Sequence, residues 1–193
     1  ISYKPKYKPL LSDSVFKIAR KTNERFEDIK YAIWETQWLN EFSQHQTSNQ
    51  MIVVEVEKEF VDSLYYYLND NLRMDFFLNP DEKEIQFYIS ESNVPVIIKR
   101  LVTRAPIQKI KNKKAVVPIA TLEKIMVDLF ADENLLHFYQ GSEMVNIYEK
   151  IIDRYSINFT KLFSYAKRRK KEQEIKQFIS NNIPNFLEDI QYD

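Results

Sequence analysis

A single glycine constrains this chain more than any other feature of its sequence. Gly141 is the only glycine among 193 residues. The phosphate-binding P-loop, the dinucleotide fingerprint and the nucleophile elbow each need several glycines, because the backbone there turns sharply or approaches a ligand closely. The sequence therefore excludes the nucleotide-binding and hydrolase classes that depend on these motifs.

The supply of metal ligands and nucleophiles is equally restricted. The chain has no cysteine, which excludes disulfides, zinc ribbons, iron–sulfur clusters and thiol nucleophiles. Its two histidines, His45 and His137, are too few for a histidine-rich metal site. We therefore expect no cofactor.

Charge and hydropathy indicate a globular protein outside the membrane. Apolar residues make up 44% and charged residues 29% of the chain, as in soluble domains. The 28 basic residues balance the 28 acidic ones, so binding to nucleic acid would have to depend on local patches. No apolar run reaches the ~18 residues of a spanning helix, and no signal peptide is present. We expect a cytoplasmic location. Because the chain begins at Ile1, we interpret it as a fragment.

The pattern of apolar residues predicts an α/β (or α+β) fold. Segments rich in β-branched residues alternate with helical spacing in the first part of the chain, which favours a mixed sheet of about four to five strands with flanking helices. The predicted strands are residues 29–34, 51–57, 74–78 and 94–98, the last near an edge because of Pro95.

An all-helical part follows the predicted sheet. Helical spacing recurs in successive segments of residues 119–193, with Ser142 and Asn158 as expected N-caps. Near the start of the chain, Ser12 or Asp13 is expected to cap another helix, whose buried stripe at helical spacing is Val15, Ile18, Ala19 and Thr22. We predict a single compact domain over residues 1–193, with a strand-bearing part at 1–118 and a helical part at 119–193.

Three carboxylates form the strongest candidate for metal-dependent chemistry. Glu55 and Glu57 lie two apart on a predicted strand and share a face, while Glu35 closes the preceding strand. Acids gathered at strand ends hold Mg²⁺ in nucleases and nucleotidyltransferases. The spacing fits neither class well, because Lys58 directly follows Glu57 and the only Gly-Ser turn is far away. A metal site at these residues is the alternative hypothesis, and a solvated strand end is favoured.

Residues 34–46 combine two tryptophans with polar side chains. Trp34 and Trp38 are expected to be buried core residues, with Thr36 capping a short helix. The alternative is a polar pocket walled by the indoles. His45 is interpreted as a structural histidine, because no nucleophile or paired acid stands at a useful spacing.

Two basic segments are the candidate binding surfaces for a nucleic acid or an acidic partner. The first lies between residues 94 and 118 and contains no acid, and the second is the run KRRKK at 167–171. The alternative is a solvated helix end favoured by the helix dipole. The candidate residues are Lys99, Arg100, Arg104, Lys109, Lys111, Lys167, Arg168, Arg169 and Lys170. By contrast, Lys124 and Asp128 are expected to form an ordinary i,i+4 pair on an exposed helix face.

Several longer motifs occur together along nearly the whole chain. Residues 3–180 resemble a group of uncharacterised bacterial proteins related to the AbiEi antitoxins of type IV toxin–antitoxin and phage-defence systems. The link to the antitoxins depends mainly on a Leu-Glu-Lys…Val-Asp motif that starts at Leu122. The motifs that carry the resemblance are WETQWLNEF (34–42), VVEVEKEFVDSLYYYL (53–68), FFLNPD (76–81), TRAPIQK (103–109), PIATLEKIMVDLF (118–130), YQGSE (139–143) and INFTKLFSYAKRR (157–169).

The resemblance implies a regulatory protein that is not an enzyme. Such proteins carry a winged-helix DNA-binding module ahead of an α/β domain, neutralise or are encoded beside a nucleotidyltransferase-like toxin, and repress their own operon. This chain lacks the winged helix, so DNA would be contacted through a module absent here. Self-association is a further expectation. The resemblance supplies no catalytic residues, and the glycine usual after the paired arginines is replaced by Lys170.

Overall fold

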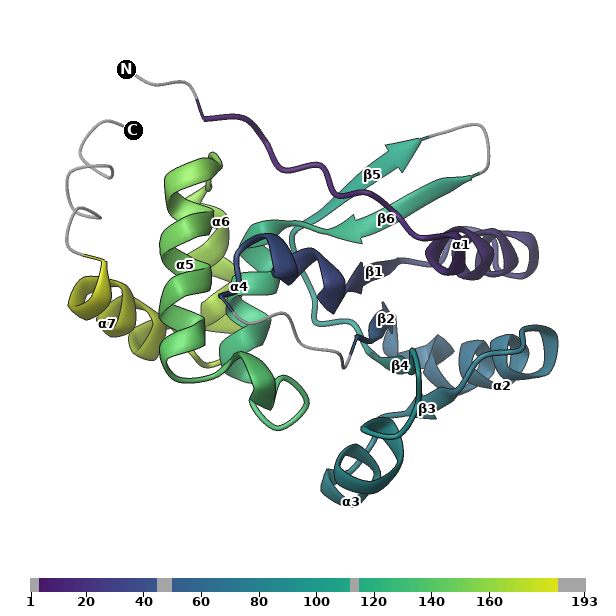
Figure 1. The fold of residues 1–193 in the computed structure, drawn as a ribbon. Helices are drawn as coiled ribbons and strands as arrows, with labels where there is room; N and C mark the ends of the chain where they lie inside the picture. The colour runs from purple at the N-terminus through teal and green to yellow at the C-terminus, as the bar shows by residue number, and fades with distance from the viewer. Residues whose placement is uncertain (1–3, 45–49, 112–114, 184–193) are drawn as a thin grey trace.

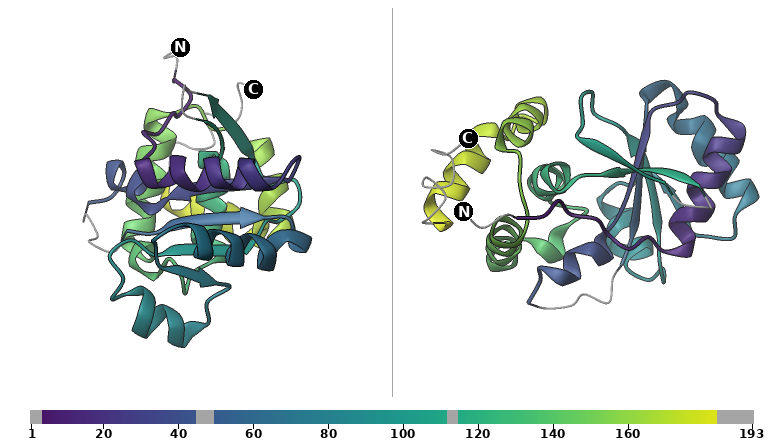
Figure 2. Two further views of the ribbon diagram at one scale, coloured as in Figure 1. Left: turned by 90° about the vertical axis from the view of Figure 1, so that its right-hand side faces the viewer. Right: turned by 90° about the horizontal axis from the view of Figure 1, so that it is seen from above.

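A six-stranded mixed sheet forms the centre of the molecule. The computed structural model describes residues 4–44, 50–111 and 115–183. Figure 1 shows the sheet, and Figure 2 shows helices on both of its faces. The strand order is β3-β4-β2-β1-β6-β5. The strands are β1 (Tyr31–Glu35), β2 (Ile52–Val56), β3 (Phe76–Leu78), β4 (Val96–Arg100), β5 (Ile107–Lys111) and β6 (Val116–Ala120).

Strand pairing in the sheet is partly parallel, as the alternation of strands and helices predicted. β2, β3 and β4 run parallel to one another, and β1 runs parallel to β6. β1 pairs antiparallel with β2, and β5 with β6. The predicted α/β class is therefore confirmed, with six strands in place of four to five.

The missed strands are the β5–β6 hairpin, most of which lies in the basic segment between residues 94 and 118. Exposed lysines alternate with half-buried residues on β5, as on an edge strand with one wet face. β4 lies near an edge, as expected, but it is not the edge strand itself. It sits between β3 and β2, and Pro95 precedes the strand, where its carbonyl accepts a hydrogen bond from the Ile52 N–H (2.9 Å).

Two helices cover one face of the sheet. α1 (Asp13–Arg25) is capped by the Ser12 side chain, which accepts a hydrogen bond from the Val15 N–H at 3.2 Å. Its predicted stripe at helical spacing is confirmed, because Val15, Ile18, Ala19 and Thr22 are all buried. α2 (Val61–Asn71) follows the short helix η2 (Lys58–Phe60) and packs beside α1 against β3 and β4.

After β6 the described chain is helical apart from turns, as predicted for the C-terminal part, and its helices lie on the opposite face of the sheet (Figure 2). α4 (Leu122–Ala131) packs against the sheet, and α5 (Ser142–Arg154), α6 (Phe159–Arg168) and α7 (Glu172–Asn182) surround it (Figure 2). The Asn158 side chain caps α6, as expected. Ser142 is instead the first residue of α5 and follows Gly141 at φ +64°, so the expected Ser142 cap is wrong.

The remaining short helices lie in the connections. η1 (Thr36–Glu41) follows β1, and η4 (His137–Tyr139) precedes α5. Thr36 does not cap η1. Its hydroxyl accepts a hydrogen bond from the Met51 N–H (2.9 Å) instead. Between β3 and β4 the chain forms α3 (Glu82–Glu84) and η3 (Ile85–Ile89), which project from the body in Figure 1.

The N-terminal segment, residues 4–11, is extended and is hydrogen-bonded to both the C-terminal helical part and β5. Pro5 accepts a hydrogen bond from Ser156 N–H (3.0 Å), and Tyr7 accepts one from the Gln108 side chain (3.3 Å). The Tyr7 ring is buried against aromatic neighbours. In the part of the chain that the structure describes, no helix is long and apolar enough to cross a membrane.

Candidate functional site: a buried ionic cluster and an exposed basic surface

A buried lysine on α4 is the most unusual feature of the interior. The Lys124 ammonium is fully buried and pairs with two carboxylates, Glu55 on β2 and Asp128 one turn further along α4. Unpaired burial of such charges is costly, so they occur inside proteins almost only in matched sets. We call the whole set the ionic cluster. It comprises Glu55, Lys99, Lys124, Asp128, Asp132 and Arg169.

The ionic cluster joins three elements that are distant in sequence. Glu55 and Lys99 are register partners on β2 and β4 and therefore lie on the same face of the sheet. The Tyr165 hydroxyl on α6 donates a hydrogen bond to Asp128 (2.9 Å). Just after α6, Arg169 contacts Asp128 (3.2 Å) and Asp132 (2.9 Å). Ion pairs thus connect the sheet to α4 and α4 to α6.

The structure overturns one sequence prediction here and divides another. Lys124 and Asp128 do not lie on an exposed face, because the sheet covers α4 on one side and α5 and α6 cover it on others. Arg168 and Arg169 were candidates for one basic surface; Arg168 is exposed, whereas the Arg169 side chain is 11% exposed and pairs with Asp128 and Asp132. Neighbouring helical residues point about 100° apart, so Arg168 faces outward where Arg169 faces inward.

The sequence did contain a signal for this burial. Six of the nine residues 122–130 are apolar, and around the helix Val127 separates Glu123 from Lys124 and Asp128, which leaves only a narrow polar face. A helix of that kind is buried, and its charged residues must then find partners inside. Tyr165, Glu55 and Arg169 could not be identified as those partners without the fold.

Burial and pairing shift the pKa values of the cluster in opposite directions. Burial raises the pKa of the Glu55 carboxyl above its usual range, although the Lys124 ammonium opposes this. Burial would lower the pKa of Lys124, but the carboxylates of Asp128 and Glu55 outweigh it and hold this pKa above its usual range. Likewise, Lys99 and Arg169 overcome burial and lower the pKa of Asp132. The pairing keeps the lysine charged.

The ionic cluster reaches solvent at one end. Lys99 and Asp132, joined at 2.7 Å, are 17% and 19% exposed and line a cleft of about 530 Å³ between α3 and the end of α4. The cleft is also lined by Asn79, Asp81, Glu82, Glu133 and Asn134. Its polar groups are largely occupied already, as with the Asn134 amide, which donates to Glu82 (3.0 Å).

The three carboxylates of the predicted metal site are not brought together. Glu55 belongs to the ionic cluster, Glu35 accepts a hydrogen bond from the Ser12 N–H (3.2 Å), and Glu57 accepts one from the Lys30 N–H (3.1 Å). Glu57 also lies beyond the end of β2, so it does not share a strand face with Glu55. Within residues 4–44, 50–111 and 115–183, no group of three acidic or histidine side chains could hold a metal ion.

The predicted basic residues divide among three places. Lys99 and Arg169 lie in the ionic cluster, and Lys109 and Lys111 lie exposed on the edge strand β5. The remaining five are exposed at the ends of β4 and α6, and we call them the basic surface. They are Arg100, Arg104, Lys167, Arg168 and Lys170.

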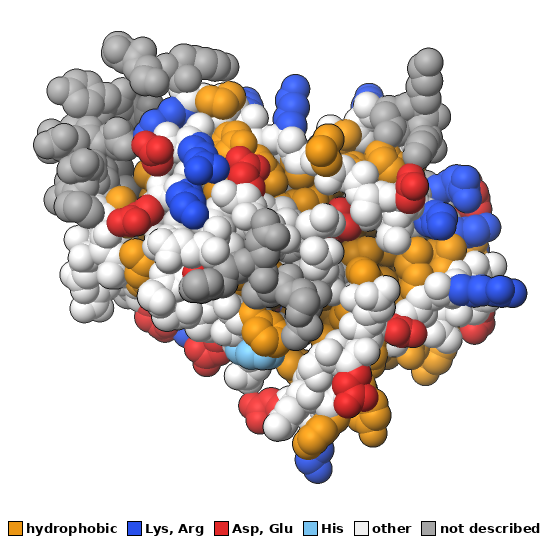
Figure 3. Space-filling view, viewed as in Figure 1, with side chains coloured by type: hydrophobic (Ala, Val, Ile, Leu, Met, Phe, Trp, Pro, Cys, Tyr) orange, Lys and Arg blue, Asp and Glu red, His pale blue; other side chains and the backbone are white. Residues whose placement is uncertain are grey.

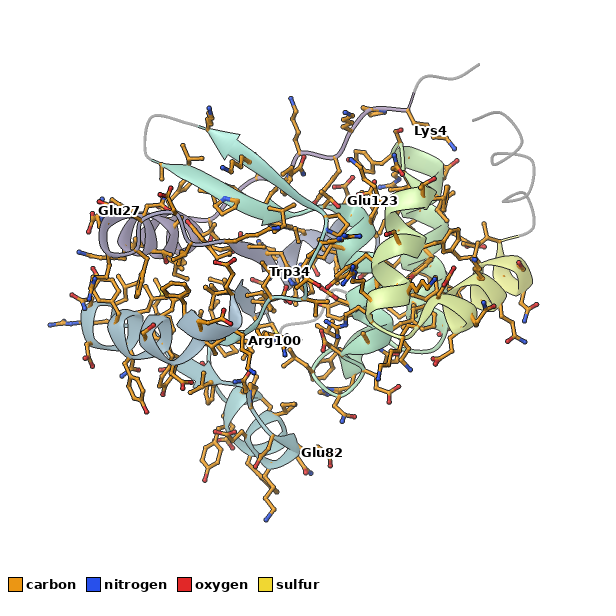
Figure 4. All side chains as sticks on the ribbon, turned by 180° about the vertical axis from the view of Figure 1, so that it is seen from behind. Lys4, Glu27, Trp34, Glu82, Arg100 and Glu123 are labelled. Atoms are coloured by element: carbon orange, nitrogen blue, oxygen red, sulfur yellow. The ribbon has the colours of Figure 1, made fainter. Side chains whose placement is uncertain are left out.

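A hydrogen bond joins the two halves of the basic surface. The Arg168 guanidinium donates to the Thr103 hydroxyl at 3.0 Å, which links the end of α6 to the turn after β4. Figure 4, which shows the molecule from behind, labels Arg100 at the end of β4, near the middle of the view. Lys170 follows with a left-handed φ of +58°, a conformation that favours glycine. The glycine that the resemblance implies at this position would adopt this conformation without strain.

The tryptophans are structural, as predicted. Trp34 and Trp38 are 1% and 6% exposed. Trp38 touches the wall of a surface cleft of about 460 Å³, which is also lined by residues 7–12, Gln37 and Glu41. His45 falls outside the described residues.

The comparisons with known proteins give one family. The sequence model of a family described as "Family of unknown function (DUF6577)" matches residues 1–185. The chain belongs to this family. No curated protein and no solved structure matches it. No activity is assigned to the DUF6577 family, so the AbiEi resemblance remains a prediction from the motifs quoted above. The site of this DUF6577 chain must therefore be interpreted from its own geometry.

Proposed function

We propose that this chain is a binding and regulatory domain of the AbiEi antitoxin type that acts by association with a partner. The observation that carries the proposal is the Arg168–Thr103 hydrogen bond, because it joins basic residues of two distant segments into one exposed surface. Five exposed cations with no acid among residues 96–106 or 161–171 suit an acidic protein face or a phosphate backbone.

The ionic cluster supports this interpretation in a different way. Its charged groups are paired with one another, and Glu55 and Lys124 are sealed from solvent. A general acid or base must reach a substrate, whereas these groups reach only each other. We interpret the cluster as the structural support that fixes α6, and with it Arg168, against the sheet.

The resemblance suggests the partners. A nucleotidyltransferase-like toxin encoded beside the gene is the first candidate. Operator DNA is the second, contacted mainly through a winged-helix module that the resemblance places ahead of this domain. Both partners would be met in the cytoplasm.

Charge reversal on the basic surface tests the proposal. The variant Arg104→Glu/Arg168→Glu should weaken binding to the neighbouring gene's product, or to duplex DNA as a probe, by about tenfold or more. Added salt should weaken binding by wild type in the same direction. Lys17→Glu/Arg20→Glu on the exposed face of α1 is the matched control and should change affinity far less. An equal loss of affinity in both variants, or an unchanged affinity in both, would show that the basic surface is not the binding site.

A second assay addresses the competing enzyme hypothesis. The chain is incubated with Mg²⁺ or Mn²⁺ and DNA, RNA or nucleoside triphosphates, and turnover is measured. We expect none. Turnover that disappears in Glu57→Ala or Glu55→Ala, with folding verified by circular dichroism, would overturn the proposal in favour of metal-dependent catalysis.

A further inference from the structure

The connection between β3 and β4 forms an arm with an exposed aromatic tip. The arm comprises residues 79–95 and projects from the body beyond α2 in Figure 1. Phe87 and Tyr88 on η3 are 57% and 64% exposed, and Val94 is 38% exposed. Ile89, on the same short helix, is buried. The arm is thus anchored by one side while its rings face solvent, and exposed apolar groups clustered in this way mark interaction surfaces.

The arm carries more acidic than basic side chains. It contains Asp81, Glu82, Glu84 and Glu91, against one base, Lys83. Figure 3 shows hydrophobic, acidic and basic side chains together at the lower edge of the molecule, where the arm projects. The capping box between Asp81 and Glu84 fixes the start of α3 and holds these two carboxylates in place. The arm is therefore suited to a partner that presents cations.

The chain itself carries a surface with the matching chemistry. The basic surface defined above has five exposed cations, of which two are arginines next to the β4–β5 turn and one is the arginine held by Thr103. Guanidinium groups stack on aromatic faces and pair with carboxylates, so one arginine satisfies both kinds of group on the arm. The chain has no net charge, because 28 basic residues balance 28 acidic ones, so long-range repulsion between copies is minimal.

We propose that the arm of one copy docks on the basic surface of a second copy of this chain. In a two-fold pair each arm meets the other copy's basic surface, so both contacts form at once and association stops at the dimer. The rings of Phe87 and Tyr88 stack on guanidinium groups of the second copy's basic surface. Glu82 and Glu91 pair with other cations of that surface. This inference extends the proposed function, because the docked arm and an acidic partner compete for the same surface.

Sedimentation velocity and light scattering on the isolated chain test the proposal. At about 100 μM protein and about 20 mM salt we expect twice the 23.2 kDa chain mass, and at about 500 mM salt a shift toward monomer. Phe87→Ser/Tyr88→Ser should weaken the dimer at least about tenfold with an unchanged circular dichroism spectrum. Lys17→Glu/Arg20→Glu on α1 is the control and should remain dimeric.

A charge-swap mixture gives the decisive result. Glu82→Lys/Glu91→Lys gives a basic arm, and Arg104→Glu/Arg168→Glu an acidic counter-surface, so each variant alone should be monomeric. Mixed in equal amounts, the two should form a heterodimer, because arm and surface are again opposite in charge. A monomeric wild type at low salt, or a mixture that stays monomeric, would overturn the proposal. These assays contain no other partner, so their failure leaves the toxin or DNA proposal separately testable.

Discussion

Removing the Lys124 ammonium is the sharpest perturbation of the ionic cluster. In Lys124→Met most of the aliphatic stem is retained, so little packing is lost. The two carboxylates left behind are buried, with Glu55 and Asp128 each 1% exposed. Asp128 keeps the Arg169 guanidinium at 3.2 Å, but Glu55 loses its ion-pair partner without gaining water. Removing one partner of a buried ion pair costs about 3–5 kcal/mol. With an m-value of about 2 kcal/mol per M, the urea midpoint should fall by about 2 M.

The pH dependence separates lost charge from lost packing. In wild type, burial already raises the pKa of Glu55, against the pull of Lys124. Without the ammonium this pKa rises further, so the folded variant keeps a proton that the unfolded chain releases above about pH 4.3. The stability of the variant therefore falls as the pH rises. The raised pKa of Lys124 leaves its own contribution in wild type fully present below about pH 10.4, so this term is constant over the range of the test.

The assay is urea unfolding, followed by tryptophan fluorescence and far-ultraviolet circular dichroism at about pH 5 and about pH 8. The loss of unfolding free energy in Lys124→Met should be smaller at about pH 5 than at about pH 8. The control is Lys21→Met on α1, whose exposed pair with Glu24 (3.1 Å) should be worth less than about 0.5 kcal/mol. Lys124→Met/Glu55→Gln/Asp128→Asn should recover part of the loss, and it serves as the test if the single variant does not fold. A loss below about 1 kcal/mol, or one equal at both pH values, would refute the reasoning.

Three further predictions concern single side chains. Arg169→Ala should lower the free energy of unfolding by about 3 kcal/mol, because Arg169 pairs with Asp128 and Asp132. Arg168→Ala should lower it by less than about 0.5 kcal/mol, because the Arg168 side chain is exposed. Equal losses in urea titrations would contradict this difference. Trp34→Ala should cost about 3–5 kcal/mol in thermal unfolding, and a loss under about 1 kcal/mol would mean that the indole is not packed. Lys170→Gly should raise stability by about 0.5–1 kcal/mol, since it relieves a left-handed residue, whereas Lys167→Gly within α6 should lower it by about 1 kcal/mol.

Local patterns in the sequence predicted local structure well. The stripe of α1, its Ser12 cap, the Asn158 cap and the burial of the tryptophans depend on interactions within a few residues or on hydrophobicity alone. The β5–β6 hairpin was missed because Lys109 and Lys111 on an edge strand look like a charged linker. An edge strand needs only one apolar face, and its lysines belong to the other.

The candidate site was predicted only in part, because its partners are set by tertiary structure. The sequence singled out the basic segments, but only the packing of α6 separates Arg168 from Arg169. Glu55 was expected at a solvated strand end, with a metal ligand as the alternative; it is instead buried and faces Lys124, which is 69 residues away in the chain. No spacing rule along the sequence connects two such residues.

This separation has a consequence for how the protein is made. While a ribosome is still synthesising α4, β2 has already left the exit tunnel with Glu55 uncompensated, and β1 still lacks its parallel neighbour β6 on one side. Contacts this distant close slowly, and an unpaired strand edge can recruit other chains in the meantime. Because the Ser156 N–H also donates a hydrogen bond to the backbone of Pro5, this contact of the N-terminal segment forms only after α5 has emerged. A chain that stops before α4 therefore leaves Glu55 without its counterion and the sheet open beside β1.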